Sequence, residues 1–204
     1  MVDVCLFIDP LRDFLEVGGR YCELFGEEQT VHVREAGAHI NDLYTHCRRT
    51  GIKVVLVTSI YARDEFEGVP NLCVSNEGRE FAVQGVDNSS IDEDIMVVTK
   101  YKNSVIHSDR TDELLDLIRT NHILICGVTT TSCIQHCVFD LADCCASVSL
   151  GLNAVGCRLT KTAERQHVLD RFGTNPQVSV HDTWEEAVGI GVAGTHNKSH
   201  DAKV

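Results

Sequence analysis

Short apolar segments alternate with stretches of helical periodicity, and this alternation constrains the fold more than any other feature of the sequence. Apolar runs bounded by turn residues are typical of buried β-strands, and they occupy residues 2–8, 53–60, 95–99 and 122–127, with weaker candidates at 152–156 and 178–180. Apolar residues at helical spacing occupy residues 30–49, 111–120, 133–150 and 162–172. The alternation predicts an α/β fold whose mostly parallel sheet is covered by helices on both faces.

Glycines and loop composition set the expected boundaries. Gly51 and Gly151 follow two of the helical stretches, and glycine is the usual residue after a last helical turn. Residues 10–29 and 61–94 show no regular pattern, and loops of this length often shape a pocket or a subunit contact. Residues 189–204 are polar and contain glycine, so we expect one domain over residues 1–188 and a flexible C-terminal tail.

Charge and cysteine usage narrow the class of protein. Thirty acidic residues against eighteen basic ones give a net charge of -12, which repels phosphate backbones and anionic lipid. Neither nucleic acid nor a membrane is therefore expected as a partner. The ten cysteines are spread through apolar segments, which favours buried thiols in a reducing compartment over a disulfide framework. Since the N-terminus has no basic signal-type region either, we expect a cytoplasmic protein.

Three chemically different residues follow three of the predicted strands. Asp9 follows the first strand, Lys100 the third, and Cys133 comes after the turn that closes the fourth. Because the carboxyl ends of parallel strands meet at one edge of the sheet, these residues are expected to converge where α/β proteins bind ligands. A thiol attacks a carbonyl as thiolate, a carboxylate can take its proton, and a lysine cation stabilises both anions. The three residues therefore predict a nucleophilic site.

The candidate nucleophile lies in the stretch His122-Ile-Leu-Ile-Cys-Gly-Val-Thr-Thr-Thr-Ser-Cys133. An apolar strand ends at a glycine, and a threonine cluster follows it. Cys133 comes next, in the expected first turn of a helix, where the helix dipole favours a thiolate. Structural interpretations stay open: the cysteine can be core packing, Asp9 a turn cap and Lys100 a solvated strand end. His136 and Cys137 lie nearby, but no second cluster with zinc-site spacing supports them, so neither a metal nor another cofactor is expected.

Three motifs occur in order: Asp9-Pro-Leu-Arg-Asp-Phe14, Lys100-Tyr-Lys-Asn-Ser104 and Gly127-Val-Thr-Thr-Thr-Ser-Cys133-Ile134. In these motifs the chain resembles the isochorismatase-like cysteine hydrolase superfamily, which includes nicotinamidases, N-carbamoylsarcosine amidases and ureidoacrylate amidohydrolases. The resemblance implies a three-layer α/β/α, Rossmann-like fold with a six-stranded sheet of order 3-2-1-4-5-6. The chain departs from the family pattern after the second strand, where residues 58–63 lack the Asp-x-His metal motif of nicotinamidases.

The resemblance also implies roles for individual residues. Asp9 corresponds to the general acid/base, Lys100 to its electrostatic partner and Cys133 to the nucleophile. A cis peptide bond is implied between Val128 and Thr129, with the backbone N–H groups of Thr129 and Cys133 as the oxyanion hole. In the implied strand order the third strand lies two places from the first, about 10 Å away. Either the long stem of Lys100 covers much of that distance or the chain bends inward.

Loop position adds three predicted pocket residues, Phe14, Tyr61 and Tyr101, and leaves Lys102 as a competitor of Lys100 that the spacing to Ser104 disfavours. The leading hypothesis is hydrolysis of a small amide, ureido or related C–N bond through a thioester acyl-enzyme. Three alternatives stay open: an isochorismatase-type hydrolase of a non-amide small molecule, a thiol redox protein that uses Cys133 and Cys137, and a non-catalytic interaction protein. The expected partner is a small-molecule substrate, and the resemblance implies a homo-oligomer, either a dimer or a tetramer.

Overall fold

Six parallel strands form a single sheet in the computed structural model, which describes residues 1–60, 72–144 and 147–190. The strands are β1 (Val4–Ile8), β2 (Lys53–Ser59), β3 (Met96–Lys100), β4 (His122–Val128), β5 (Ser147–Gly156) and β6 (Val178–His181). Their order is β3-β2-β1-β4-β5-β6, and every neighbouring pair is parallel. The predicted fold class and strand order are confirmed.

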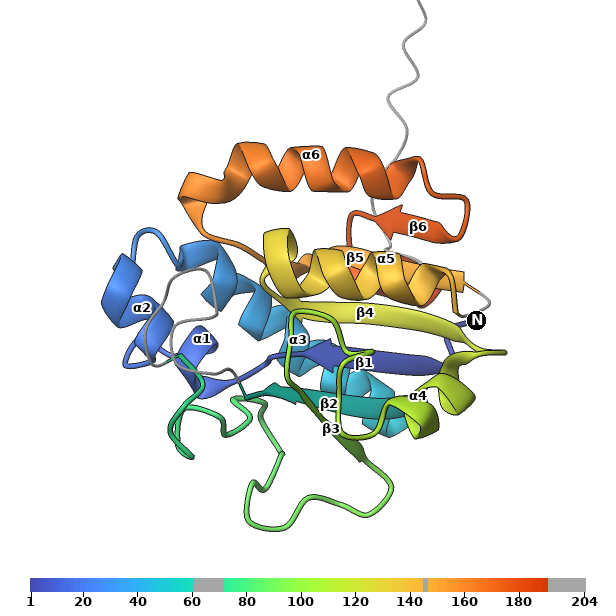
Figure 1. Cartoon of the computed structure of the whole chain (residues 1–204), viewed down its shortest axis with the longest axis horizontal. Helices are drawn as coiled ribbons and strands as arrows, with labels where there is room; N and C mark the ends of the chain where they lie inside the picture. Colours follow the sequence, from blue (N-terminus) through green and yellow to red (C-terminus); the bar gives the residue numbers. More distant parts are fainter. Residues whose placement is uncertain (61–71, 145–146, 191–204) are drawn as a thin grey trace, which may run out of the picture.

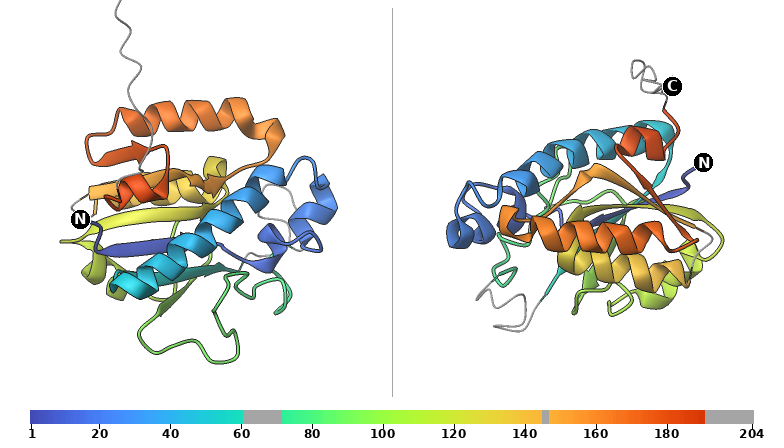
Figure 2. Two further views of the ribbon diagram at one scale, coloured as in Figure 1. Left: turned by 180° about the vertical axis from the view of Figure 1, so that it is seen from behind. Right: turned by 90° about the horizontal axis from the view of Figure 1, so that it is seen from above.

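Helices cover both faces of the sheet and give three layers (Figures 1 and 2). One face carries α3 (Val31–Thr50) and α7 (Trp184–Ala187), and the other carries α4 (Thr111–Ile118), α5 (Gln135–Ala142) and α6 (Thr162–Gly173). A π-helical turn, η1 (Thr130–Ile134), leads into α5, and a 3-10 turn, η2 (Leu159–Lys161), leads into α6. Two short helices, α1 (Arg12–Leu15) and α2 (Arg20–Phe25), lie beyond the carboxyl end of β1 at the left of Figure 1, within a stretch expected to be irregular.

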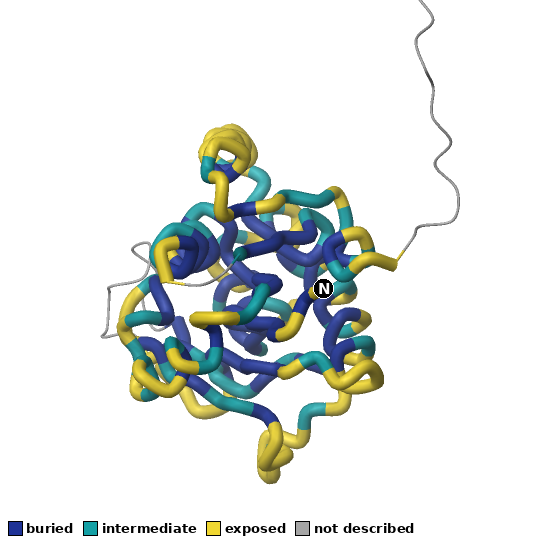
Figure 3. Tube along the Cα trace, turned by 90° about the vertical axis from the view of Figure 1, so that its right-hand side faces the viewer, coloured by how far each residue is buried: buried dark blue, intermediate teal, exposed yellow. Residues whose placement is uncertain are grey.

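The central strands are buried on both faces, which explains their unbroken apolar sequences. Every residue of β1 is buried, as is every residue of β4 after His122, and Figure 3 shows the buried chain concentrated in the middle of the molecule. At the end of β4, Gly127 has a φ of 124° and faces the backbone of Ile8 so closely that a Cβ atom would collide with it. This glycine lets the chain after β4 turn directly beside the end of β1.

One predicted helix is wrong in its second half. The expected helix over residues 133–150 stops at Ala142, and residues from Ser147 onward form β5. Leu141 and Val148 are seven residues apart, a helical spacing, but Val148 is buried in the strand. Gly151 lies inside β5, where a Cβ atom would collide with the backbone of Trp184. That glycine therefore accommodates α7 and does not end a helix.

The other boundary predictions have different outcomes. Gly51 ends α3 in the left-handed conformation with a φ of 77°, which confirms the predicted helix end. Most of the predicted tail, residues 191–204, lies outside the described residues, as does Tyr61. No helix within residues 1–60, 72–144 and 147–190 combines the length and the hydrophobicity that crossing a bilayer requires.

We expect Gly127→Ala to lower the free energy of unfolding by about 3 kcal/mol or more, because the new methyl group meets backbone in the middle of the sheet and the φ is unfavourable for alanine. Gly173→Ala, at the end of α6 with no heavy atom within 4 Å of a built Cβ, is the control and should change it by less than about 0.5 kcal/mol. Urea denaturation of both variants measures the difference, and equal midpoints would contradict the account of Gly127.

Candidate active site

The three strand-end residues predicted to converge lie at the carboxyl edge of the sheet. Val57 of β2 is aligned with Ile8 of β1 on one side and with Val98 of β3 on the other. Asp9 follows β1 directly, and Lys100 is the last residue of β3. Both side chains therefore begin at the carboxyl edge of the sheet, and β2 lies between them.

The ammonium group of Lys100 lies close to both Asp9 and Cys133. Its Nζ lies 2.8 Å from Asp9 Oδ2 and 3.3 Å from Cys133 Sγ, and the side chains of Lys100 and Asp9 are 0% exposed. Cys133 is equally buried. The lysine stem thus spans the width of β2, which resolves the separation implied by the strand order. Lys102, the competing lysine, is exposed.

Two opposing effects act on the Lys100 ammonium. Burial lowers the pKa of Lys100, but the negative charge of the adjacent Asp9 carboxylate raises it, as does Cys133 when it is ionised, and the net pKa is above the ordinary value. The lysine is therefore held as a cation at neutral pH despite its complete burial. A cation at this position stabilises a carboxylate and a thiolate at the same time.

Ser59 also belongs to the site, although it was not among the residues predicted from the sequence. Its Oγ donates a hydrogen bond of 2.5 Å to Asp9 Oδ1, while the other carboxylate oxygen faces Lys100. Asp9 itself has a φ of 50° and donates its backbone N–H to the Val57 carbonyl at 3.0 Å. The carboxylate is thus oriented through both of its oxygens. Only its position at the end of a strand could have indicated this role from the sequence, because Ser59 is the last residue of β2 and lies at the same edge of the sheet.

Cys133 lies in the π-helical turn η1 and not in the first turn of an α-helix as expected. The Val128–Thr129 peptide bond before this turn is cis, where the resemblance implies one. The Thr129 carbonyl accepts hydrogen bonds from the backbone N–H groups of Ser132 and Ile134, both at 3.1 Å. Thr130 Oγ1 ties the turn to the end of β5 by donating to the Gly156 carbonyl at 3.1 Å. An oxyanion hole formed by the Thr129 and Cys133 N–H groups stays a prediction.

The predicted pocket residues are placed differently from one another. Phe14 is fully buried, with its ring centroid 5.3 Å from that of Tyr21, whereas Tyr101 is 49% exposed. Their roles in substrate binding stay predictions. Among the described residues, no three His, Cys, Asp or Glu side chains are grouped so that they could hold a metal ion.

Because a buried charge without its partner is costly, we expect Lys100→Met to lower the free energy of unfolding by about 3 kcal/mol. Adding Asp9→Asn should restore a large part of that loss, since no unpaired charge is then left inside. Arg119→Met is the control: this arginine is 69% exposed in an ion pair with Asp116, and its loss should cost less than about 0.5 kcal/mol. Chemical denaturation measures these variants and Asp9→Asn alone, and strictly additive effects of the two buried substitutions would contradict the coupling.

Solved structures with the same fold come from several organisms. A nicotinamidase from Bacillus subtilis has a TM-score of 0.71 at 17% identity, covering 89% of this chain and 100% of its own. A putative isochorismatase hydrolase from Oleispira antarctica has a TM-score of 0.68 at 18% identity, covering 91% and 96%. An N-carbamoylsarcosine amidase from Thermoplasma acidophilum has a TM-score of 0.66 at 18% identity, covering 89% and 96%. Identities this low show the shared fold alone.

The family follows from the sequence itself. No curated protein sequence matches the chain, but the sequence model of the isochorismatase domain matches residues 3–158, which is more than half of the chain. The matched range includes all of β1 to β5 and therefore Asp9, Ser59, Lys100 and Cys133. The chain belongs to the isochorismatase domain family of hydrolases.

Proposed function

We propose that this protein hydrolyses a small amide, ureido or related C–N bond and that Cys133 is its nucleophile. The observation that carries the proposal is the position of Lys100 Nζ, 2.8 Å from Asp9 Oδ2 and 3.3 Å from Cys133 Sγ in a fully buried cluster. A cation between a carboxylate and a thiol favours the ionised form of both groups. The carboxylate can then accept a proton, and the sulfur is activated as a nucleophile.

In the proposed reaction Asp9 takes the proton of the Cys133 thiol, and the thiolate attacks the carbonyl carbon of the substrate. The Lys100 ammonium stabilises the thiolate, and the backbone N–H groups of Thr129 and Cys133 receive the developing oxyanion. Asp9 then returns the proton to the leaving ammonia or amine as the C–N bond breaks, which leaves a thioester on Cys133. Attack of water on the thioester releases the acid and regenerates the thiol.

The names of two structural neighbours agree with this reaction class. One is a nicotinamidase and the other an N-carbamoylsarcosine amidase. Both names denote amidases, and we extend the amide class to this chain as part of the proposal. The substrate is proposed to be a small molecule.

The redox alternative has less support, although Cys137 lies close enough to Lys100 and Cys133 to interact with both. Burial raises the pKa of Cys137 to about 12, and the nearby Lys100 offsets only part of this effect. Cys137 Sγ also contacts the Asn103 carbonyl oxygen at 3.6 Å. A buried thiol that stays protonated is a poor resolving nucleophile. A redox function would also not require the carboxylate of Asp9 to be oriented by Ser59.

Replacing the nucleophile tests the proposed reaction. We expect Cys133→Ala to lower ammonia release by about 1000-fold or more on any member of a panel of small amides and ureido acids that the wild type turns over. Cys144→Ala is the matched control, because Cys144 is an exposed cysteine, and it should keep full activity. Circular dichroism checks that both variants are folded. Turnover by Cys133→Ala at the wild-type rate would refute the proposal.

Oxidation separates the hydrolase from the redox alternative. After treatment of the folded protein with hydrogen peroxide, we expect peptide mapping by mass spectrometry to find no Cys133–Cys137 disulfide, because the Cys137 thiol stays protonated. Rapid and stoichiometric formation of that disulfide, reversed by dithiothreitol, would instead favour a redox role.

A further inference from the structure

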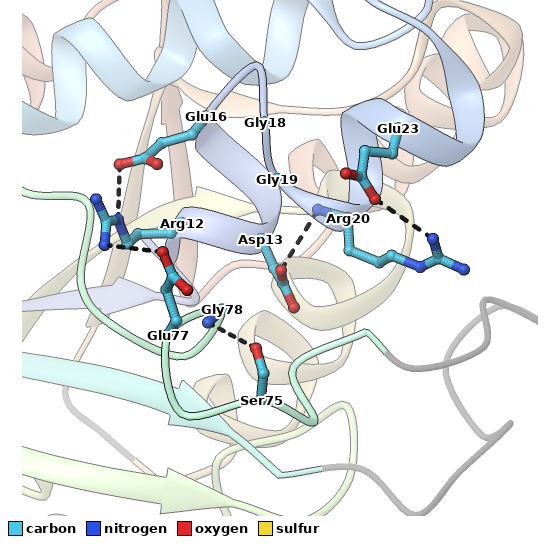
Figure 4. Close-up of a pocket in the computed structure, with 10 residues that line it drawn as sticks. All are labelled: Arg12, Asp13, Glu16, Gly18, Gly19, Arg20, Glu23, Ser75, Glu77 and Gly78. Carbon is cyan, nitrogen blue, oxygen red and sulfur yellow. Dashed lines mark hydrogen bonds and ion pairs between the residues drawn. The ribbon is translucent and has the colours of Figure 1, made fainter.

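A second buried carboxylate, Asp13, lies four residues after Asp9 and has no part in the proposed reaction. It is only 8% exposed and belongs to the short helix α1. Its Oδ2 accepts the backbone N–H of Cys73 at 2.7 Å, and its Oδ1 accepts the backbone N–H of Arg20 at 3.4 Å. The Asp13 side chain therefore connects α1 to the start of α2, seven residues later, and to Cys73, sixty residues later. Figure 4 shows its bond to the backbone of Arg20.

The chain after Cys73 is fixed along residues 10–13 by backbone hydrogen bonds. Asp13 N donates to the Gly78 carbonyl at 3.1 Å, Arg12 N to that of Glu80 at 2.9 Å, and Ala82 N to that of Pro10 at 2.8 Å. The Arg12 guanidinium adds an ion pair with Glu80 at 2.9 Å. This segment thus depends on α1 for its position, and α1 begins three residues after Asp9.

Gly78 provides the space for the Asp13 carboxylate. A Cβ atom at position 78 would collide with all three atoms of that carboxyl group, whereas a Cβ at Gly18, which lines the same cavity of about 290 Å³, would meet nothing within 4 Å. Neither glycine has a positive φ, so any difference between their alanine variants is steric. Figure 4 shows Gly78 beside Asp13 and Gly18 at the end of the loop above it.

Cys73 has a backbone conformation that needs support. Its φ of 55° is uncommon for a residue with a side chain, and the hydrogen bond to Asp13 holds it there. The side chain is fully buried, and its thiol lies within electrostatic range of Asp9, Lys100 and Cys133. Burial raises the pKa of Cys73 well above its ordinary value, and the charges of Asp9 and Asp13 raise it further. Cys73 is therefore a neutral thiol within electrostatic range of the Asp9–Lys100–Cys133 cluster.

We propose that Asp13 is a positioning residue whose carboxylate holds the turn at Cys73 against the Asp9–Lys100–Cys133 cluster, so that the Cys73 side chain forms a fixed, uncharged wall of the substrate site. The contact between Asp13 and Cys73 stands on its own, whereas the role in substrate binding rests on the proposed hydrolase function. A charged acceptor suits this task because its hydrogen bonds to two backbone donors are stronger than those of a neutral group.

Two variants break this contact in different ways, and each has a matched control. Asp13→Asn keeps the shape of the side chain but removes its charge and one acceptor oxygen. Gly78→Ala keeps the carboxylate but displaces it. Glu16→Gln makes the same change of charge at an exposed position of the same segment, and Gly18→Ala adds the same methyl group to an open position of the same cavity.

Alkylation of Cys73 by iodoacetamide, mapped by mass spectrometry, tests the contact without any substrate. We expect the rate to rise about tenfold or more in Asp13→Asn and Gly78→Ala and to stay at the wild-type value in both controls, because loss of a charge-assisted hydrogen bond favours local opening. Cys47, on the buried face of α3, should stay protected in every variant, which separates local opening from global unfolding. An unchanged Cys73 rate in both test variants would overturn the proposal.

Kinetics on an amide that the wild type hydrolyses test the role in binding. A displaced wall should raise KM by about tenfold while kcat stays within about threefold, because the reacting groups are left in place. Unchanged KM in variants whose Cys73 has become reactive would overturn the positioning role while leaving the hydrolase function intact. If the wild type hydrolyses no amide but Cys73 responds as expected, the function fails and the contact between Asp13 and Cys73 is supported.

Discussion

The buried ion pair of Lys100 and Asp9 is the interaction on which the arrangement of the site depends. Moving an isolated ammonium into a protein interior costs several kcal/mol, so the lysine is stable there only with its counter-charge at 2.8 Å. The parallel order β3-β2-β1 brings the two residues to one edge of the sheet, and the long lysine side chain crosses β2 to close the gap. Ser59, on the strand between them, fixes the carboxylate that receives the lysine.

Much of this arrangement was predictable because it follows from chain periodicity and strand ends. The buried strands, the parallel sheet and the residues at its carboxyl edge were all visible as apolar runs that stop at Asp9, Lys100 and Gly127. The second half of the helix predicted over residues 133–150 was wrong because Val148 and Leu150 fit a helical and a strand pattern equally well. Tertiary packing decides such cases: Gly151 faces the backbone of α7, a contact that no local pattern contains.

The residues that sequence reasoning missed act through partners that are far away in the chain. Ser59 matters because it meets Asp9, fifty positions earlier, and Cys73 because its backbone meets Asp13, sixty positions earlier. A serine at a strand end and a cysteine in an irregular loop are each unremarkable as residue types. Their roles depend on which segments the β1–β2 and β2–β3 connections bring together, and only the folded chain shows this.

The complete burial of the three central side chains has a consequence for the energetics of the proposed reaction. With the thiol protonated, Asp9 and Lys100 together carry no net charge. When the proton moves from Cys133 to Asp9, the negative charge changes place within reach of the same ammonium, and the sum over the cluster stays zero. The surrounding protein therefore does not have to stabilise any additional net charge. A dry interior, which would oppose ionisation of a lone thiol, can thus accommodate an internal proton transfer at little cost.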